Sequence, residues 1–346
     1  MTTLLHDIEV FPAGWTAAEC QELVSALTRR RLITGTAAAG LLALRPDGSD
    51  ASSQPVASPV AGYPRTIEHV LGETVIPSRP ARVVAVSDFM DLDYLLTLGV
   101  EPVLYGFTNA WDSGAMPWQS AAAAFPSFDA TGDPDLEAIA GANPDLILGM
   151  QSIEAVYPQM SEIAPIIAFG WDTAWREGIR LAATALGLES LAEERIAEAD
   201  LIIEAAKTEL APIAGKRLRV GFEYGDIFYV WGEETAASKL FKELGLNFIG
   251  GPEPSLTALS LEQVNTLDDA EILLSVGSDP AGIEMQEASP LFRSLPAVQN
   301  GGYEVLTVIQ SRALGDGLSP ISLPWVMPQF VELMLKLANG GGKQLG

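Results

Sequence analysis

The chain has 346 residues, 48% hydrophobic and 19% charged, which is typical of a globular chain long enough for about two domains. Its 45 Asp and Glu residues outnumber 20 Lys and Arg, and the net charge of −25 argues against nonspecific nucleic-acid binding and against docking on anionic lipid. Two histidines, His6 and His69, and one cysteine, Cys20, leave little material for a His/Cys metal site and exclude an intramolecular disulfide bond.

The first fifty residues have the pattern of an export signal. Arginines at 29–31 precede thirteen uncharged residues, 32–44, a length that suits the apolar part of a signal peptide and is short for a membrane-spanning helix. The stretch from Thr28 resembles the twin-arginine export signal, with Arg29 and Arg30 as its paired arginines. A surface helix with a basic end is the alternative interpretation.

A polar spacer rich in Pro and Ser, residues 45–59, follows the apolar run, and we expect cleavage between Ala43 and Ala61. No cysteine follows the apolar run, so we expect no lipid anchor of the usual kind. The first fifty residues hold six of the acids and four of the bases, which leaves 39 acids and 16 bases in the remainder. This composition favours an extracytoplasmic soluble protein, in a periplasm or at a cell surface.

Short aliphatic runs alternate with helical patterns in the next part of the chain. A run at 83–86 predicts a buried strand, and the following helix over 91–98 is expected to end at Gly99. Further strands are predicted over 102–105, 145–148 and 165–169. Strands that alternate with helices predict a parallel sheet with crossover helices.

The second half of the chain repeats this order. A strand is predicted over 218–222, and a helix over 237–244 is expected to end at a glycine, as in the first half. A cap residue followed by Leu-Glu and an aliphatic strand occurs at Asp135 and again at Ser260. The repeat predicts two βαβ lobes.

One long helix is predicted between the halves. Ser190 and Glu193 form a capping-box pattern, and buried positions are expected at a spacing of three and four: Ile196, Ala199, Ile203, Ala206 and Leu210. About twenty residues at 1.5 Å each would span roughly 30 Å, enough to cross from lobe to lobe. We therefore predict an α/β chain with an N-terminal lobe at 51–178, linker helices at 179–213 and a C-terminal lobe at 214–346.

Ordered motifs along residues 65–338 carry a family resemblance. They lie at 72–84, 98–103, 136–139, 143–147, 185–188, 260–263, 295–298 and 301–306. Together they resemble the substrate-binding proteins of ABC importers for ferric siderophores and cobalamin, the class III periplasmic binding proteins. The resemblance implies a monomer that captures an iron chelate between two lobes and delivers it to a permease dimer. It implies no covalent chemistry and no cofactor apart from the ferric ligand.

Two glutamates occupy equivalent places in the repeat. Glu137 and Glu262 each follow a helix-cap candidate by two residues, where a carboxylate is favourable against the helix dipole by about 0.3–1 kcal/mol. That stabilising role is one interpretation. The resemblance implies another, in which these glutamates dock on arginines of the permease dimer.

Ligands of open α/β sheets bind beyond the carboxyl ends of the strands, so we expect binding residues in the loops that follow the strands. Aromatic faces offer large contact area, and an arginine offers a charged fork for chelate oxygens. The candidates are Phe89, Trp111, Trp171, Tyr224, Trp231 and Arg312. Ordinary packing is the alternative for each aromatic residue, and a surface salt bridge is the alternative for Arg312.

The scarcity of basic residues favours a neutral or cationic ligand, such as a ferric hydroxamate, over a trianionic catecholate complex. The predicted function is therefore a ferric siderophore receptor without enzymatic activity. A cobalamin or haem receptor, an enzyme on the same fold and a signalling sensor are the alternatives. Neither histidine falls in the expected cleft loops, which disfavours a histidine site for a bare metal, whereas Asp and Glu ligands stay open.

Overall fold

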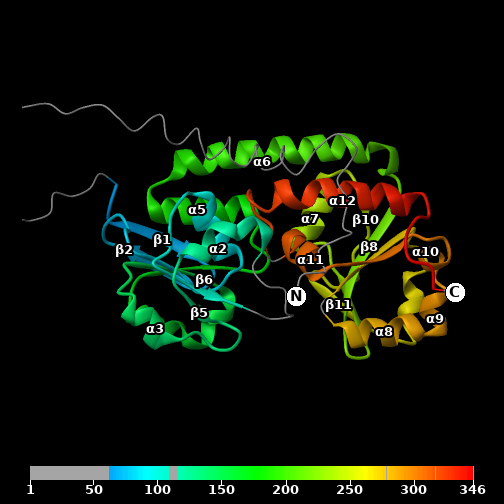
Figure 1. The fold of residues 1–346 in the computed structure, drawn as a ribbon, viewed down its shortest axis with the longest axis horizontal. Helices are drawn as coiled ribbons and strands as arrows, with labels where there is room; N and C mark the ends of the chain where they lie inside the picture. Colours follow the sequence, from blue (N-terminus) through cyan, green and yellow to red (C-terminus); the bar gives the residue numbers. More distant parts are fainter. Residues whose placement is uncertain (1–61, 109–115, 278, 316, 346) are drawn as a thin grey trace, which may run out of the picture. The chain divides into compact units, whose positions relative to one another are not determined.

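The computed structural model describes residues 62–108, 116–277, 279–315 and 317–345 (Figure 1). The expected export signal with Arg29 and Arg30, the spacer after it and the candidate Trp111 lie outside the described residues. The described elements all belong to one unit, residues 59–346. Within the described ranges, no helix is both long and apolar enough to cross a membrane.

The first half of the unit is built on a parallel sheet with the order β5-β4-β3-β6-β7. Its strands are β3 (Val83–Ala85), β4 (Leu104–Phe107), β5 (Ser127–Asp129), β6 (Leu146–Met150) and β7 (Ile166–Phe169). β3, β6 and β7 are buried along their whole length, as expected for aliphatic strands of a parallel sheet with both faces covered. The four expected strands are confirmed, with β4 beginning two residues later than predicted; β5 was not predicted.

Short helices follow these strands. They are α2 (Met90–Thr97), α3 (Leu136–Gly141) and α4 (Tyr157–Ser161), with 3₁₀ turns η3 (Pro117–Ala124) and η4 (Gln151–Val156). α2 ends where the sequence predicts, because Gly99 adopts a φ of +67° that a residue with a Cβ rarely accepts. An antiparallel hairpin, β1 (Arg65–His69) and β2 (Gly72–Ile76), precedes the sheet and was not predicted.

The second half has a mixed sheet with the order β11-β9-β8-β12-β13, and β10 also pairs with β8. The strands are β8 (Arg217–Tyr224), β9 (Ile227–Trp231), β10 (Asn247–Phe248), β11 (Leu256–Ser260), β12 (Ile272–Val276) and β13 (Tyr303–Leu306). β8, β12 and β13 are parallel as expected. β9 and β11 are antiparallel, so this half is not a simple copy of the first. Gly225, with a φ of +61°, allows the tight turn between β8 and β9.

Six helices are described after β9. They are α7 (Ala236–Glu243), α8 (Pro280–Ala288), α9 (Pro290–Arg293), α10 (Pro296–Gln299), α11 (Val308–Leu314) and α12 (Leu323–Ala338). The predicted helix over 237–244 corresponds to α7. A 3₁₀ turn, η6 (Val264–Leu267), stands where the repeat predicted an α-helix after Ser260, and that prediction was wrong.

The long linker helix is confirmed as α6 (Glu189–Leu210), which follows α5 (Trp175–Leu186) and ends in the 3₁₀ turn η5 (Ala211–Ile213). In Figure 1 it runs along one side of the unit, past elements of both halves. Its buried residues include every predicted position from Ile196 to Leu210, and it packs against α5 and α12. The predicted capping box is wrong, because α6 begins at Glu189 and Glu193 instead pairs with Arg180 of α5.

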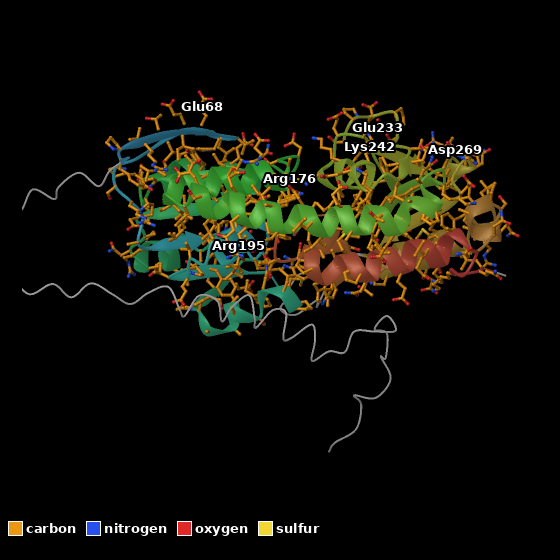
Figure 2. All side chains as sticks on the ribbon, turned by 90° about the horizontal axis from the view of Figure 1, so that it is seen from above. Glu68, Arg176, Arg195, Glu233, Lys242 and Asp269 are labelled. Carbon is orange, nitrogen blue, oxygen red and sulfur yellow. The ribbon has the colours of Figure 1, made fainter. Side chains whose placement is uncertain are left out.

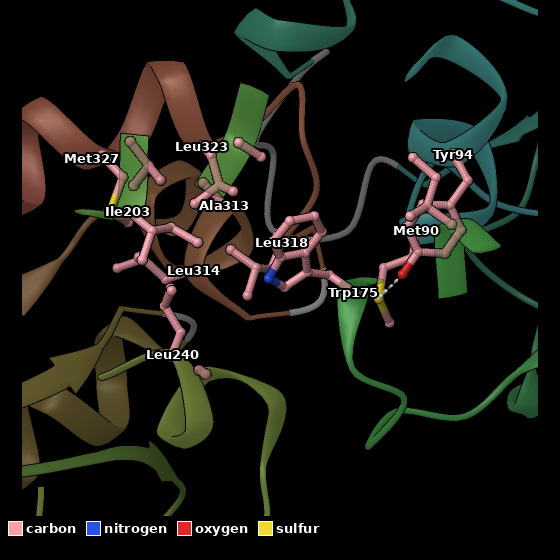
Figure 3. Packing of buried hydrophobic residues seen from close by; sticks show 14 of the residues in the cluster. Met90, Tyr94, Trp175, Ile203, Leu240, Ala313, Leu314, Leu318, Leu323 and Met327 are labelled. Atoms are coloured by element: carbon pink, nitrogen blue, oxygen red, sulfur yellow. Dashed lines mark hydrogen bonds between the residues drawn. The ribbon is translucent and has the colours of Figure 1, made fainter. Parts of the chain in front are cut away.

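One apolar cluster continues across both halves beneath this linker. Figure 3 shows part of it, with Met90, Tyr94 and Trp175 from the first half and Leu240, Leu314 and Met327 from the second. Ile203 of α6 belongs to the same cluster and is fully buried. The two sheets are therefore joined by a continuous core as well as by the chain itself.

An ion-pair group joins three helices beside this core. Arg176 of α5 donates to Asp200 of α6 at 2.8 Å and to Glu243 of α7 at 2.6 and 3.0 Å. Figure 2 shows Arg176 beside α6, with Arg195 on the same helix. Burial lowers the pKa of Arg176, but the carboxylates of Glu243 and Asp200 raise it by more. The pKa is therefore raised overall, and Arg176 stays positively charged at all ordinary pH values.

The buried stripe of α6 predicts a large cost for truncating its central side chain. Ile203→Ala is expected to lower the free energy of unfolding by about 2–4 kcal/mol, because a cavity forms where α6 meets the shared core. Leu201→Ala is the matched control, since Leu201 is 73% exposed on the same helix and should change stability by about 0.5 kcal/mol or less. Urea unfolding followed by circular dichroism measures both. Equal effects of the two variants would contradict the packing described for α6.

Candidate ligand-binding site

Three of the predicted binding residues come together where the two sheets present their carboxyl ends. Phe89 follows β3, and its ring lies edge-to-face with Trp171, which follows β7, at a centroid distance of 5.8 Å. Arg312 was predicted in a loop but belongs to α11, after β13 of the other sheet. Its Cζ lies 4.4 Å from the centroid of the Phe89 ring. A continuous aromatic-cation contact therefore joins the first half to the second.

The local sequence explains why Arg312 is held there. Thr307 caps α11, and Gln310 reaches back to it, which forms a capping box directly after β13. This cap fixes the direction of a helix of only two turns. Arg312 is therefore presented from a rigid element and is only 4% exposed.

Arg312 does not form a salt bridge at the surface. It pairs with a buried carboxylate of the other half. Asp88, the residue before Phe89, is 1% exposed, and both its carboxylate oxygens lie 3.4 Å from Arg312 nitrogens. Nη2 of Arg312 also donates to the main-chain oxygen of Asp88 at 3.0 Å. Asp88 Oδ1 and Arg312 Nε have no hydrogen bond within the described residues. The sequence analysis missed Asp88, although it is the only acid between β3 and α2.

A second buried carboxylate links the halves beside this pair. Asp93 of α2 accepts hydrogen bonds from Trp118 at 3.0 Å, from Gln119 at 2.6 Å and from Ser319 at 2.7 Å. Ser319 lies between α11 and α12 of the second half, so this bond crosses the interface. Burial raises the pKa of Asp93 to about 7, against the lowering effect of these donors and of Arg312.

The aromatic residues around Asp93 continue the interface. Trp118, which the sequence places in the loop after β4, lies in η3, and its ring is 5.3 Å from that of Trp325 in α12. A β-carbon built on Gly317 would lie 3.3 Å from the Trp118 indole, so this loop has little space for a side chain there. Trp118 could be identified from the sequence as an aromatic residue after a strand. Its partner Trp325 lies within a helix, and nothing in the sequence marks it as a site residue.

Two other candidates occupy different environments. Tyr224 ends β8 at the hairpin turn and is 73% exposed. Trp231 is at the far end of β9 and pairs with Leu256 of β11, so it does not lie in a loop as predicted. Its ring stacks on Phe241 at 6.4 Å, and a β-carbon on Gly315 would lie 4.0 Å from it. The indole therefore borders the loop that follows α11.

The two predicted docking glutamates are both exposed but differ in local structure. Glu137 lies in the first turn of α3, and Asp135 caps this helix by accepting from the Ala138 amide at 2.9 Å. Glu262 lies in a turn, because Ser260 ends β11 rather than capping a helix. In Figure 1, α3 and β11 both lie on the side away from α6.

Neither a metal cluster nor a free histidine marks this site. No group of three or more His, Cys, Asp or Glu residues that could hold a metal occurs among the residues the structure describes. His69 lies in the β1–β2 hairpin, where one ring nitrogen contacts Thr74 at 3.0 Å and the other accepts from the Leu71 amide at 3.2 Å. The residues at the site offer aromatic faces, one ion pair and neutral hydrogen-bond donors.

Burial of Asp93 predicts a defined pH dependence of stability. Between pH values of about 4 and 7 the folded chain keeps a proton that the unfolded chain has lost, so this group makes the free energy of unfolding fall as the pH rises. Thermal unfolding from pH 4 to 8 should therefore show a steeper decline for the wild type than for Asp93→Asn. Glu68→Gln, at an exposed acid of β1, is the control and should follow the wild-type curve. A wild-type curve parallel to that of Asp93→Asn would contradict the protonation of Asp93.

Comparison with known proteins places this geometry in a family. The family model described as Periplasmic binding protein matches residues 84–303. The chain is 27% identical over 242 residues to the Fe(3+)-citrate-binding protein YfmC of Bacillus subtilis, which covers 68% of this chain and 76% of that protein. It is also 27% identical over 267 residues to the ferric enterobactin-binding periplasmic protein FepB of Escherichia coli, covering 69% and 83% respectively.

A solved structure agrees with the sequence relatives. The iron uptake ABC transporter substrate-binding protein PiaA of Streptococcus pneumoniae superposes with a TM-score of 0.67 at 25% identity, over 80% of this chain and all of that one. Because the family model matches residues 84–303, which include parts of both halves, the chain belongs to the Periplasmic binding protein family.

Proposed function

We propose that this protein is an extracytoplasmic solute-binding protein that captures a ferric siderophore between its two lobes and delivers it to an ABC importer. The observation that carries the proposal is the contact of Trp171, Phe89 and Arg312, which lines the meeting point of the two carboxyl edges with aromatic faces and a cation. Relatives whose names state ferric citrate and ferric enterobactin as their ligands support an iron chelate as the ligand class.

The mechanism needs binding and release but no covalent step. Phe89 and Trp171 would contact the flat chelating groups of the ligand, while the buried Arg312 would hold the second lobe against the first through Asp88. Tyr224, Trp231 and Trp111 are the further ligand candidates. The proposed lobes are residues 51–178 and 214–346, with 179–213 as linker helices. A stiff α6 packed on both halves would permit only modest lobe movement.

The same proposal covers export and membrane docking. A twin-arginine-type signal with Arg29 and Arg30 would carry the chain out of the cytoplasm. Glu137 and Glu262, both exposed, would dock on basic sockets of the permease dimer. The protein would act as a monomer and without enzymatic turnover.

Ligand titration tests the proposal directly. The full chain is titrated with ferric hydroxamate, ferric catecholate and ferric citrate complexes, cobalamin and haem, while intrinsic tryptophan fluorescence is followed. Because Trp171 and Trp118 lie at the proposed site, saturable quenching by a ferric chelate at submicromolar concentration is expected. Binding of cobalamin or haem instead would assign the ligand to that class, and chemical alteration of a chelate would reveal an enzyme. A folded chain that binds nothing in the panel would contradict the proposal.

Charge reversal tests the docking role. Glu137→Arg and Glu262→Arg should each abolish uptake of the iron chelate by cells that carry the cognate importer, because two cations would then face each other. Chelate affinity should stay unchanged, since both glutamates are exposed and lie outside the contact of Trp171, Phe89 and Arg312. Glu101→Arg, which makes the same charge change at an exposed position between α2 and β4, is the control and should support uptake. Loss of affinity with intact permease binding would overturn this assignment.

A further inference from the structure

The segments beyond the carboxyl ends of the parallel strands are strongly acidic. Among the described residues, those after the strands of the first sheet and after β8, β12 and β13 are 86–89, 108, 116–126, 130–135, 151–156, 170–174, 225–226, 277, 279, 307–315 and 317–322, with α11 included after β13. These described residues include seven acidic residues and one basic residue, Arg312. A ligand that lies between the carboxyl edges of the two sheets is therefore exposed to a negative electrostatic potential.

The one basic residue of these segments does not offer a free positive charge. Arg312 is 4% exposed and Asp88 is 1% exposed, and the guanidinium lies 3.4 Å from both carboxylate oxygens. Its Nη2 also donates a hydrogen bond to the Asp88 main-chain oxygen, and its Cζ lies over the Phe89 ring. The pair has no net charge, so the field of the neighbouring acids is left without a compensating cation.

Two other basic side chains, Arg176 and Lys242, pair with acids that lie outside these segments. Arg176 pairs with Asp200 and Glu243, and Lys242 pairs with Glu233 at 2.8 Å. Figure 2 shows Lys242 beside Glu233. These cations are neutralised by local partners, so they do not replace the charge that Asp88 removes from Arg312.

We propose that Asp88 is a specificity-determining residue: by neutralising Arg312 it makes the site select ferric chelates of zero or positive charge and reject polyanionic ones. This inference rests on the proposed function. Three hydroxamates lose one proton each and cancel the charge of Fe³⁺, whereas three catecholates lose two protons each and leave a complex of charge −3. A trianion within about 8 Å of one uncompensated carboxylate is disfavoured roughly tenfold even in a watery site, and more where water is excluded.

The first measurement compares chelates of different charge on the wild-type chain. Equilibrium dialysis with radioiron gives the affinities for ferrichrome (neutral), ferrioxamine B (a cation) and ferric enterobactin (charge −3). The neutral and cationic complexes should bind at least 100-fold more tightly than the trianion. If the trianion binds as well as ferrichrome or better, the selectivity proposal is wrong although the receptor function stands. If none binds, the proposed function itself fails.

Substitution of the pair then tests the role of Asp88. Asp88→Asn keeps the size of the side chain and frees the charge of Arg312, so the preference for ferrichrome over ferric enterobactin should fall at least tenfold. Glu68→Gln removes one negative charge at an exposed position of β1 and should leave the preference unchanged (Figure 2). Equal effects of the two substitutions would assign the preference to net charge and overturn the role of Asp88.

A double substitution distinguishes the charge balance of the pair from direct contact of Arg312 with the ligand. It also keeps the proposal testable if the single variant does not fold. Asp88→Asn combined with Arg312→Gln restores a neutral pair and should return the preference for ferrichrome to within about threefold of the wild-type value. If the double variant instead binds the two chelates equally well or prefers ferric enterobactin, the charge balance of the pair does not set the preference. That outcome would overturn the proposal even where Asp88→Asn alone fails to fold.

Discussion

The buried stripe of α6 is the constraint on which the arrangement of the two sheets depends. Its aliphatic residues recur every three or four positions and pack on α5 from one half and α12 from the other. Sharp kinks in long helices usually occur at proline or glycine, and α6 contains neither. The carboxyl edges of both sheets are therefore brought together by one rigid element and by the core beneath it.

Polar groups are buried at this meeting point because each finds partners from the other half. Asp93 accepts from two donors of its own half and from Ser319 of the second. Arg312 spans the interface to Asp88. Burying one member of such a pair without the other costs several kcal/mol, so these groups favour the arrangement in which both halves are in contact. Apolar packing brings the halves together, and the polar contacts determine which surfaces meet.

The sequence predicted the elements that follow from local pattern. Aliphatic runs gave β3, β6 and β7, a 3-4 spacing gave the buried face of α6, and Gly99 marked the end of α2. The sequence-based predictions were wrong where contacts with distant parts of the chain determine the local structure. Glu193 matches a capping box but pairs with Arg180 on a neighbouring helix. Ser260 matches a helix cap but extends β11, because that strand pairs with β9. The β8–β9 hairpin has a clear glycine turn and could have been predicted from Gly225.

The candidate site shows the same division. Phe89, Trp171 and Arg312 could be proposed from the sequence because each comes soon after an aliphatic run, and the segments after parallel strands lie at one edge of a sheet. Asp88 could not, since its importance arises from a contact with a residue 224 positions away in the chain. An isolated arginine in a loop predicts affinity for anions, whereas the same arginine beside a buried carboxylate contributes no net charge. The electrostatic character of the cleft is therefore a property of the pair, and it follows from the packing that brings α11 into contact with the loop between β3 and α2.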